Sequence, residues 1–301
     1  QVWYNSTSNV WKVEEATAVG AWASGGNMNT TIRALAGTGT QTAALGFGGF
    51  HNPDKPTQTE EYDGSSWAIG GAISTARENL GGAGTQTSSL AFGGNLAPST
   101  VATEEYDGAT WTGGGNLGTA RYALGGAGTQ TAALGFGGYT GTAYTGATEE
   151  YDGSAWTGGG TMVTGRGYIC GCGTQTAGLV FGGYDTAATA ATEEYDGTSW
   201  TSVTSMNTAR YKLAAAGTQT AALGFGGYVP PVTGATEEYD GSTWTTLPAT
   251  MATARQSSGS SKSGTTSAAL VFGGNPPPTN LAATEEWTGA GAAVTKTITV
   301  S

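Results

Sequence analysis

The chain has 301 residues, of which 53 are glycine and 11% are charged, and its net charge is −11. Such an acidic chain lacks the basic surface that displaces counterions from nucleic acid or attracts anionic membranes. No apolar run approaches the roughly 18 residues of a membrane helix. We therefore expect no nucleic-acid partner and no membrane insertion. With no signal-peptide pattern and no initiator methionine, we expect Gln1 to be a processed end or the start of a fragment.

Residues 1–17 precede the repeated part of the chain. Residues 2–5 and 10–13 are short runs rich in apolar and aromatic residues, and the polar residues 6–9 separate them. This pattern predicts a β-hairpin followed by a linker.

Residues 18–290 repeat one pattern six times. The stretch 127–138, AGTQTAALGFGG, represents it, and the last glycine of each copy recurs every 44 to 47 residues, at Gly49, Gly94, Gly138, Gly183, Gly227 and Gly274. A period of this length indicates stacked or radially arranged units.

Each copy contains signals for four short strands. In the third copy, the small and apolar runs 121–127 and 132–136 flank a polar turn, and an Asp-Gly turn separates 148–151 from 154–157. Glycine and alanine suit strands that crowd at an axis, and large residues suit a diverging rim. We therefore predict an all-β, six-bladed β-propeller with four-stranded antiparallel blades. The recurrent rim tryptophans are Trp22, Trp67, Trp111, Trp156, Trp200 and Trp244.

The two ends of the repeated region complement each other. Trp22 stands where a fourth strand would carry it, whereas residues 255–287 supply three strands and lack that tryptophan. We expect the N-terminal strand to complete the sixth blade, because this removes an open sheet edge. Residues 291–301 form one more predicted strand, whose alternating part is 297–300. It pairs either with the N-terminal hairpin or with the rim of blade six, and the sequence leaves both open.

The repeat resembles the kelch motif across residues 20–287. The best copy is 238–248, EYDGSTWTTLP, followed by Met251 and Arg255, whereas the last copy departs with Trp287 in place of tyrosine. Residues 3–7, WYNST, resemble segments of phage tail-fibre proteins, and the GTQTAAL stretches resemble kelch-type repeats of marine phage. The resemblance implies a virion tail appendage or extracellular surface protein, a host glycan or protein as partner, and a trimer if the protein is a tail fibre.

Arginine and glutamate recur with the same period. We assign all six arginines to one repeat position, at the end of each rim-to-axis connection: Arg33, Arg77, Arg121, Arg166, Arg210 and Arg255. A Glu-Glu pair also recurs, and because adjacent strand residues face opposite ways, one member can reach between blades while the other meets solvent. We expect each arginine to pair with a glutamate and bond backbone between blades. The alternative is an arginine ring that binds an acidic ligand.

The sequence contains few residues suited to catalysis or to metal binding. His51 is the single histidine, too few for the copper site of galactose oxidase, which shares kelch-type repeats, or for zinc or Ser-His-Asp chemistry. The carboxylates recur in nearly all copies, whereas an active site usually rests on unique residues. We therefore expect that the protein is not an enzyme and that it binds neither a cofactor nor a metal. Cys170 and Cys172 fall on a predicted strand, where two inert buried thiols are expected rather than a metal site.

The copies differ most between Gly-Gly and Thr-Glu-Glu. In a propeller these loops and the rim-to-axis connections share one face, and variable loops on a rigid frame often bind ligands. Tyrosine suits contact with sugar or protein. The alternative is ordinary loop variation. The candidate ligand-binding residues are Phe50, His51, Tyr139, Tyr144, Tyr184, Asp185 and Tyr228.

We therefore expect a non-enzymatic binding or structural module, acting as a receptor-binding or adhesion propeller of a phage tail fibre or surface appendage. One alternative is a carbohydrate-active enzyme that uses two loop carboxylates. Another is a structural assembly unit with self-contact through the N-terminal hairpin.

Overall fold

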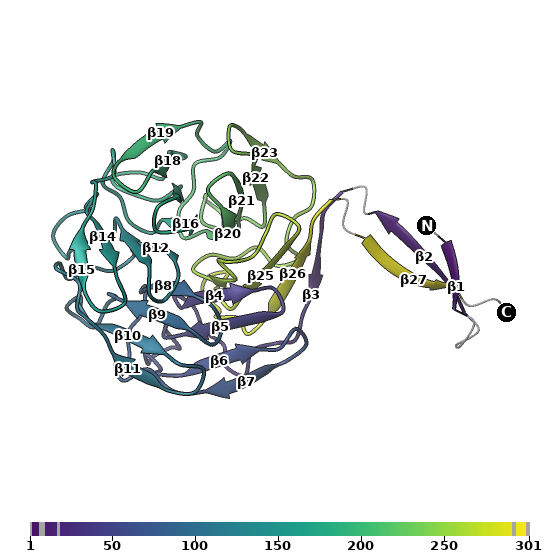
Figure 1. Ribbon diagram of the computed structural model, residues 1–301, viewed down its shortest axis with the longest axis horizontal. Coiled ribbons are helices and arrows are strands. Elements are labelled where there is room, and N and C mark those ends of the chain that lie inside the picture. Colours follow the sequence, from purple (N-terminus) through teal and green to yellow (C-terminus); the bar gives the residue numbers. More distant parts are fainter. Residues whose placement is uncertain (1, 6–9, 17–18, 291–292, 299–301) are drawn as a thin grey trace.

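The protein is a six-bladed β-propeller, seen down its axis in the computed structural model in Figure 1. The structure describes residues 2–5, 10–16, 19–290 and 293–298; for 2–5, 10–16 and 293–298 it describes the backbone alone. Each blade is a four-stranded antiparallel sheet, as predicted.

The blades follow one another in chain order, and each begins with its axial strand. Blade 1 comprises β4 (Ala36–Thr40), β5 (Ala43–Phe47), β6 (Thr59–Tyr62) and β7 (Trp67–Gly70). Blade 2 comprises β8 (Gly81–Gly84), β9 (Ser89–Phe92), β10 (Thr103–Tyr106) and β11 (Trp111–Gly113). Blade 3 comprises β12 (Gly125–Gly128), β13 (Ala133–Phe136), β14 (Thr148–Tyr151) and β15 (Trp156–Gly158). Blade 4 comprises β16 (Cys170–Gly173), β17 (Gly178–Phe181), β18 (Thr192–Tyr195) and β19 (Trp200–Val203). Blade 5 comprises β20 (Ala214–Thr218), β21 (Ala221–Phe225), β22 (Thr236–Tyr239) and β23 (Trp244–Thr246). Blade 6 comprises β24 (Gly259–Ser260), β25 (Ala268–Phe272), β26 (Thr284–Thr288) and β3 (Ala21–Ser24).

The N-terminal strand closes the ring. β3 pairs with β26, with Trp22 opposite Trp287, so the first propeller strand is the rim strand of the last blade. The predicted closure is therefore confirmed. The C-terminal strand β27 (Ala293–Ile298) instead pairs with β2 (Val10–Ala16), which pairs with β1 (Val2–Asn5). This three-stranded sheet lies beside the propeller (Figure 1), and it settles the alternative that the sequence left open.

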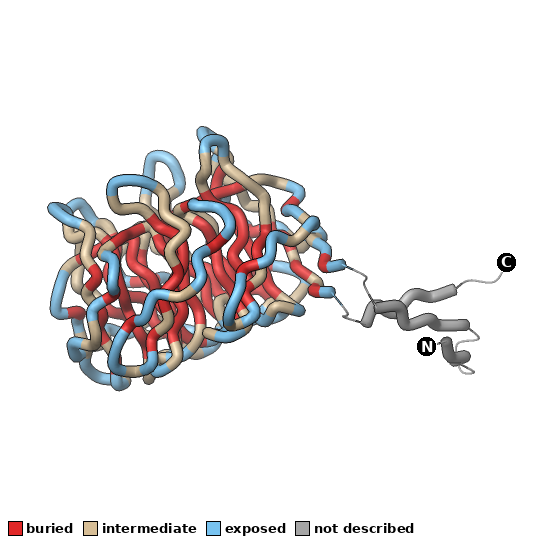
Figure 2. The backbone as a smooth tube through the Cα atoms, turned by 90° about the horizontal axis from the view of Figure 1, so that it is seen from above, coloured by how far each residue is buried: buried red, intermediate tan, exposed pale blue. Residues whose placement is uncertain are grey.

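Side-chain size follows distance from the axis. Axial strands approach so closely that a Cβ on Gly126 would lie 2.7 Å from the carbonyl oxygen of Gly82 in the preceding blade. Towards the rim, each recurrent tryptophan fills the gap to the preceding blade: Trp111 packs on Phe47, with ring centroids 4.9 Å apart, and its indole N–H donates to Thr59 Oγ1 at 3.0 Å. As a result of this packing, the strands of the propeller are buried and the loops that join them are exposed (Figure 2).

Blade-to-blade hydrogen bonds repeat around the ring. The Tyr106 hydroxyl donates to Glu61 of the preceding blade at 2.5 Å, and burial followed by this bond raises the pKa of Tyr106 to about 12. The side-chain amide of Gln86 donates to the main-chain carbonyls of Ala44 and Tyr62 at 3.1 and 2.6 Å. The repeated Tyr and Gln thus join neighbouring blades through polar contacts as well as apolar ones.

Five arginines form buried ion pairs inside their own blades. Arg121 bonds Glu149 at 3.0 Å and the carbonyls of Gly137 and Ala147, all in blade 3. The prediction of bonds between blades is therefore wrong for these side chains, because the guanidinium lies along its own sheet. The prediction that one glutamate of each Glu-Glu pair reaches between blades is confirmed in five of the six pairs, where the second glutamate accepts a bond from the next blade's tyrosine. The prediction that the other glutamate meets solvent is wrong, because the first glutamate is buried within its own blade. The other four ion pairs are Arg77–Glu104, Arg166–Glu193, Arg210–Glu237 and Arg255–Glu285.

Arg33 does not occupy the repeat position of the other five arginines. That position is filled by Ile32, which is buried, because Gly274 N–H bonds the Ile32 carbonyl as Gly49 N–H bonds that of Arg77. Arg33 lies one residue later, with its guanidinium 4.6 Å from the Phe50 ring centroid. The assignment of Arg33 to the structural repeat is therefore corrected. In blade 1 the buried Glu60 instead accepts bonds from Asn29, Thr30 and Gln58.

Candidate functional site

The variable loops and the rim-to-axis connections meet on one side of the propeller, which we call the loop face. Paired bridges join the two in every blade: Arg33–Phe50, Glu78–Asn95, Tyr122–Tyr139, Gly167–Tyr184, Tyr211–Tyr228 and Gln256–Asn275. The tight turns of each blade lie together on the opposite side, which we call the turn face. In blade 3, for example, Gly153 of the Asp-Gly turn adjoins Thr131 of the other turn. The loop face is therefore held by backbone pairing.

A closed ring of six backbone hydrogen bonds surrounds the axis at the loop face. In each blade one residue donates its N–H to the equivalent carbonyl of the preceding blade, at 2.7 to 2.9 Å, and blade 1 closes onto blade 6. This axial ring consists of Ala34, Asn79, Ala123, Tyr168, Lys212 and Ser257. All six have φ between 52° and 56°, a left-handed conformation that non-glycine residues adopt at a cost. The ring bonds hold them there, so the direction in which each side chain leaves the backbone is fixed.

The axial ring surrounds a small cavity at the mouth of the central channel. Its volume is about 80 Å³, and its floor is the aliphatic layer Leu35, Leu80, Leu124, Ile169 and Leu213, with Ser258 in the sixth blade. A second cavity of the same size lies deeper, among the axial strands, and reaches Lys262.

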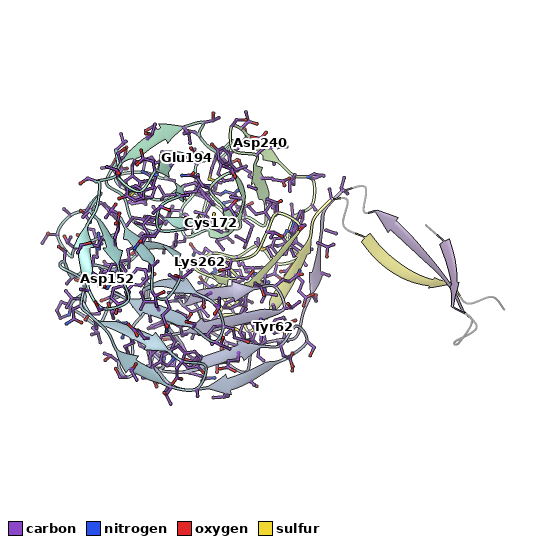
Figure 3. The ribbon with its side chains drawn as sticks, viewed as in Figure 1. Tyr62, Asp152, Cys172, Glu194, Asp240 and Lys262 are labelled. Carbon is purple, nitrogen blue, oxygen red and sulfur yellow. The ribbon has the colours of Figure 1, made fainter. Side chains whose placement is uncertain are left out.

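Lys262 lies across the channel below these cavities. Its ammonium donates to the carbonyls of Gly82 and Gly126 at 3.1 and 3.3 Å, and the next residue, Ser263, bonds Gly84. Figure 3 shows Lys262 and Cys172 near the centre of the ring. Burial lowers the pKa of Lys262 to about 8. Lys262 was not among the predicted site residues, although the hairpin 259–268 that carries it is longer than its five counterparts.

Cys170 and Cys172 are free thiols buried on the axial strand β16. Burial raises the pKa of Cys172 to about 12 and that of Cys170 well above its usual value. Both are therefore protonated at neutral pH, and the prediction of two buried thiols is confirmed.

Seven tyrosines form a continuous cluster on the loop face of blades 3–5. Successive rings contact one another with centroids 4.9 to 6.4 Å apart, and every ring is partly exposed. We call this cluster the tyrosine patch; its members are Tyr122, Tyr139, Tyr144, Tyr168, Tyr184, Tyr211 and Tyr228.

Four members of the tyrosine patch were candidates from the sequence: Tyr139, Tyr144, Tyr184 and Tyr228. The other three were not predicted, because they lie on the rim-to-axis connections, whereas all the candidates were chosen from the variable loops. A signal existed, since Tyr122 and Tyr211 directly follow Arg121 and Arg210.

Lys212 lies between two rings of the patch. Its ammonium is 4.9 Å from the Tyr168 ring centroid and 5.6 Å from that of Tyr211. Burial, followed by repulsion from Arg33, lowers the pKa of Lys212, and Glu78 opposes the shift. The cation therefore lies at the point where the tyrosine patch meets the axial ring.

The remaining sequence candidates lie elsewhere on the loop face. Phe50 packs beneath Arg33 in blade 1, and the neighbouring His51 donates from Nδ1 to the carbonyl of Thr31 at 2.7 Å. Asp185 follows Tyr184 in blade 4, where its carboxylate accepts backbone N–H groups of Thr186 and Ala187, which lower its pKa. The structure thus brings four predicted tyrosines together, places Asp185 next to one of them in the chain, and holds Phe50 and His51 in a different blade.

Within residues 19–290, whose side chains the structure describes, no group of three or more His, Cys, Asp or Glu is placed to hold a metal ion. The described residues also contain no helix long and apolar enough to cross a membrane. Comparison with known proteins finds no family model that matches the chain and no curated protein that matches it.

Proposed function

We propose that this protein is a non-enzymatic glycan-binding module whose ligand lies on the tyrosine patch. The observation that carries the proposal is the patch itself: seven partly exposed phenol rings in one contiguous array on the loop face. Aromatic rings stack on the C–H faces of sugars, and their hydroxyls bond sugar hydroxyls.

The location of the patch supports the proposal. Three of its rings, Tyr122, Tyr168 and Tyr211, belong to connections that backbone bonds join to the loops or to the axial ring. Binding residues fixed by a rigid scaffold lose little entropy when a ligand binds. The patch is thus preorganised, as a site for a weakly interacting ligand such as a sugar needs to be.

The setting we propose is a phage tail fibre or similar surface appendage that contacts a host. The support is the resemblance of the repeat to kelch repeats and of residues 3–7 to tail-fibre segments. A host protein is the other partner that a tyrosine surface fits, because tyrosine is also enriched in protein interfaces.

A glycan array tests the proposal. We expect wild-type protein to bind a defined set of glycans, and Tyr139→Ala, Tyr184→Ala and Tyr211→Ala each to reduce that binding at least tenfold, with an unchanged melting temperature. Phe50→Ala is the matched control, because it removes an aromatic ring from the other half of the same face. A wild-type protein that binds no glycan, or Tyr variants that bind as well as wild type, would contradict the proposal.

A further inference from the structure

The ammonium of Lys212 has no anionic partner among the residues whose side chains are described. The other described cations are engaged: five arginines pair with glutamates, Lys262 bonds two carbonyls, and Lys55 lies 3.4 Å from Glu78. Arg33 bonds Asn280 and lies over Phe50. Within the part of the chain whose side chains are described, Lys212 Nζ makes neither a hydrogen bond nor an ion pair, and its contacts are the faces of Tyr168 and Tyr211.

The position of Lys212 is fixed by the backbone. Its N–H donates to the Tyr168 carbonyl at 2.9 Å, and its carbonyl accepts from Ser257 at 2.8 Å, as a member of the axial ring. The side chain therefore leaves the backbone at the mouth of the channel, and Lys212 is one of the residues that line the cavity of about 80 Å³. A partly desolvated ammonium in such a place is stabilised by an anion that completes its coordination.

We propose that the ligand of the tyrosine patch is an anionic saccharide whose acidic group binds Lys212 at the channel mouth. This inference rests on the proposed function. The cavity of about 80 Å³ is large enough to hold water and has room for a small charged group such as a carboxylate or sulfate. The adjoining rings of Tyr168 and Tyr211 place a sugar ring within reach while its charged substituent meets the ammonium.

The neighbouring charges are consistent with this assignment. Repulsion from Arg33 contributes to the lowered pKa of Lys212, so a second cation adds to the positive potential at Lys212. Glu78, the acid that opposes this effect, is already paired with Lys55. The net charge of −11 would repel an anion at long range, but at physiological salt that repulsion is screened beyond about 8 Å.

An array of carboxylated, sulfated and neutral glycans tests the proposal, with each carboxylated glycan also present as its neutral methyl ester. We expect wild-type protein to bind anionic glycans at least tenfold more strongly than their neutral counterparts. Lys212→Met should remove this preference, and Lys212→Arg should retain most of it. Lys12→Met, on strand β2 of the separate three-stranded sheet, is the charge control, since it removes the same charge away from the loop face and should keep the preference. The carboxylated and sulfated arms identify which acidic group is recognised.

The outcomes separate this inference from the proposed function. Binding of neutral glycans that Tyr211→Ala abolishes and Lys212→Met leaves unchanged would overturn the anionic ligand and keep the glycan-binding module. An array on which wild-type protein binds nothing would overturn both.

Discussion

The two halves of the loop face share one backbone and differ in their side chains. In blades 3–5 the connections and loops carry the seven rings of the tyrosine patch and Lys212. In blades 6, 1 and 2 the equivalent bridges join Gln256 to Asn275, Arg33 to Phe50 and Glu78 to Asn95. Because backbone pairing is the same in both halves, the difference does not serve to hold the blades together. The repeated residues therefore fix the geometry, and we propose that the unique residues select a ligand.

The same contrast operates beneath the surface. Blade 5 buries Arg210 against Glu237, whereas blade 1 buries Ile32 at that position and supplies Glu60 with polar neighbours from the preceding connection. A framework position can therefore be filled in two ways, provided that the buried carboxylate keeps partners.

The largest expected effect comes from breaking the framework in one half. Arg210→Met leaves the Glu237 carboxylate buried without its cation and removes bonds to the carbonyls of Gly226 and Ala235, so we expect a loss of about 3–5 kcal/mol in unfolding free energy. Ile32→Met, at the equivalent position of blade 1, exchanges one apolar side chain for another and should cost less than about 1.5 kcal/mol. Urea denaturation measures both, and equal losses would contradict the contrast.

The second effect is on ligand affinity. Tyr211 contacts Tyr168, Tyr184, Tyr228 and Lys212, so Tyr211→Ala removes the ring with most neighbours in the patch. We expect at least a tenfold rise in Kd for the strongest glycan of the array, equivalent to about 1.4 kcal/mol. Isothermal titration measures it. Phe50→Ala in the other half should change Kd less than twofold, and a similar loss in both would show that the ligand covers the whole loop face.

A third test concerns Lys262, which comes from blade 6 and bonds carbonyls of blades 2 and 3, one in each half. Its pKa is lowered from 10.5 to about 8 in the folded protein, so between these values the unfolded chain binds more protons than the folded one. Stability due to this group therefore rises with pH over that range. We expect the melting temperature of wild type minus that of Lys262→Met to increase from pH 8 to pH 10. A constant difference would mean that the ammonium is not desolvated in the channel.

The smallest effect is expected where the halves do not differ, in the Asp-Gly turns of the turn face. The pKa of both Asp63 and Asp240 is lowered to about 2. The main cause is a hydrogen bond from a backbone N–H group, that of Ser66 to Asp63 and that of Thr243 to Asp240. A lowered carboxyl pKa gives stability above pH 4 that is lost as pH falls towards 2. As the pH falls from 4 to 2, the melting temperature of wild type should decrease slightly more than that of Asp63→Asn or of Asp240→Asn. Unequal results for the two variants would show that the turns sense their half of the ring.

Much of the fold follows from local patterns. The spacing of Gly-Gly and Asp-Gly marks where strands end, and the rise from Gly126 at the axis to Trp111 or Trp156 towards the rim matches blades that diverge outwards. The missing tryptophan of the last copy correctly indicated that Trp22 completes it. Arg33 was assigned wrongly because its identity matched the repeat, whereas the backbone bonds place Ile32 there.

The sequence by itself determined the repeat, the strand composition and the strand that closes the ring, because these depend on residue size and turn chemistry within one copy. The tertiary structure alone decided which copies meet, and therefore the tyrosine patch, the axial ring and the crossing of the channel by Lys262. Tyr122, Tyr168 and Tyr211 lie more than 40 residues apart in sequence and adjoin because each axial-ring residue bonds its counterpart in the preceding blade. Such contacts between copies arise from the packing of neighbouring blades, which no single copy encodes.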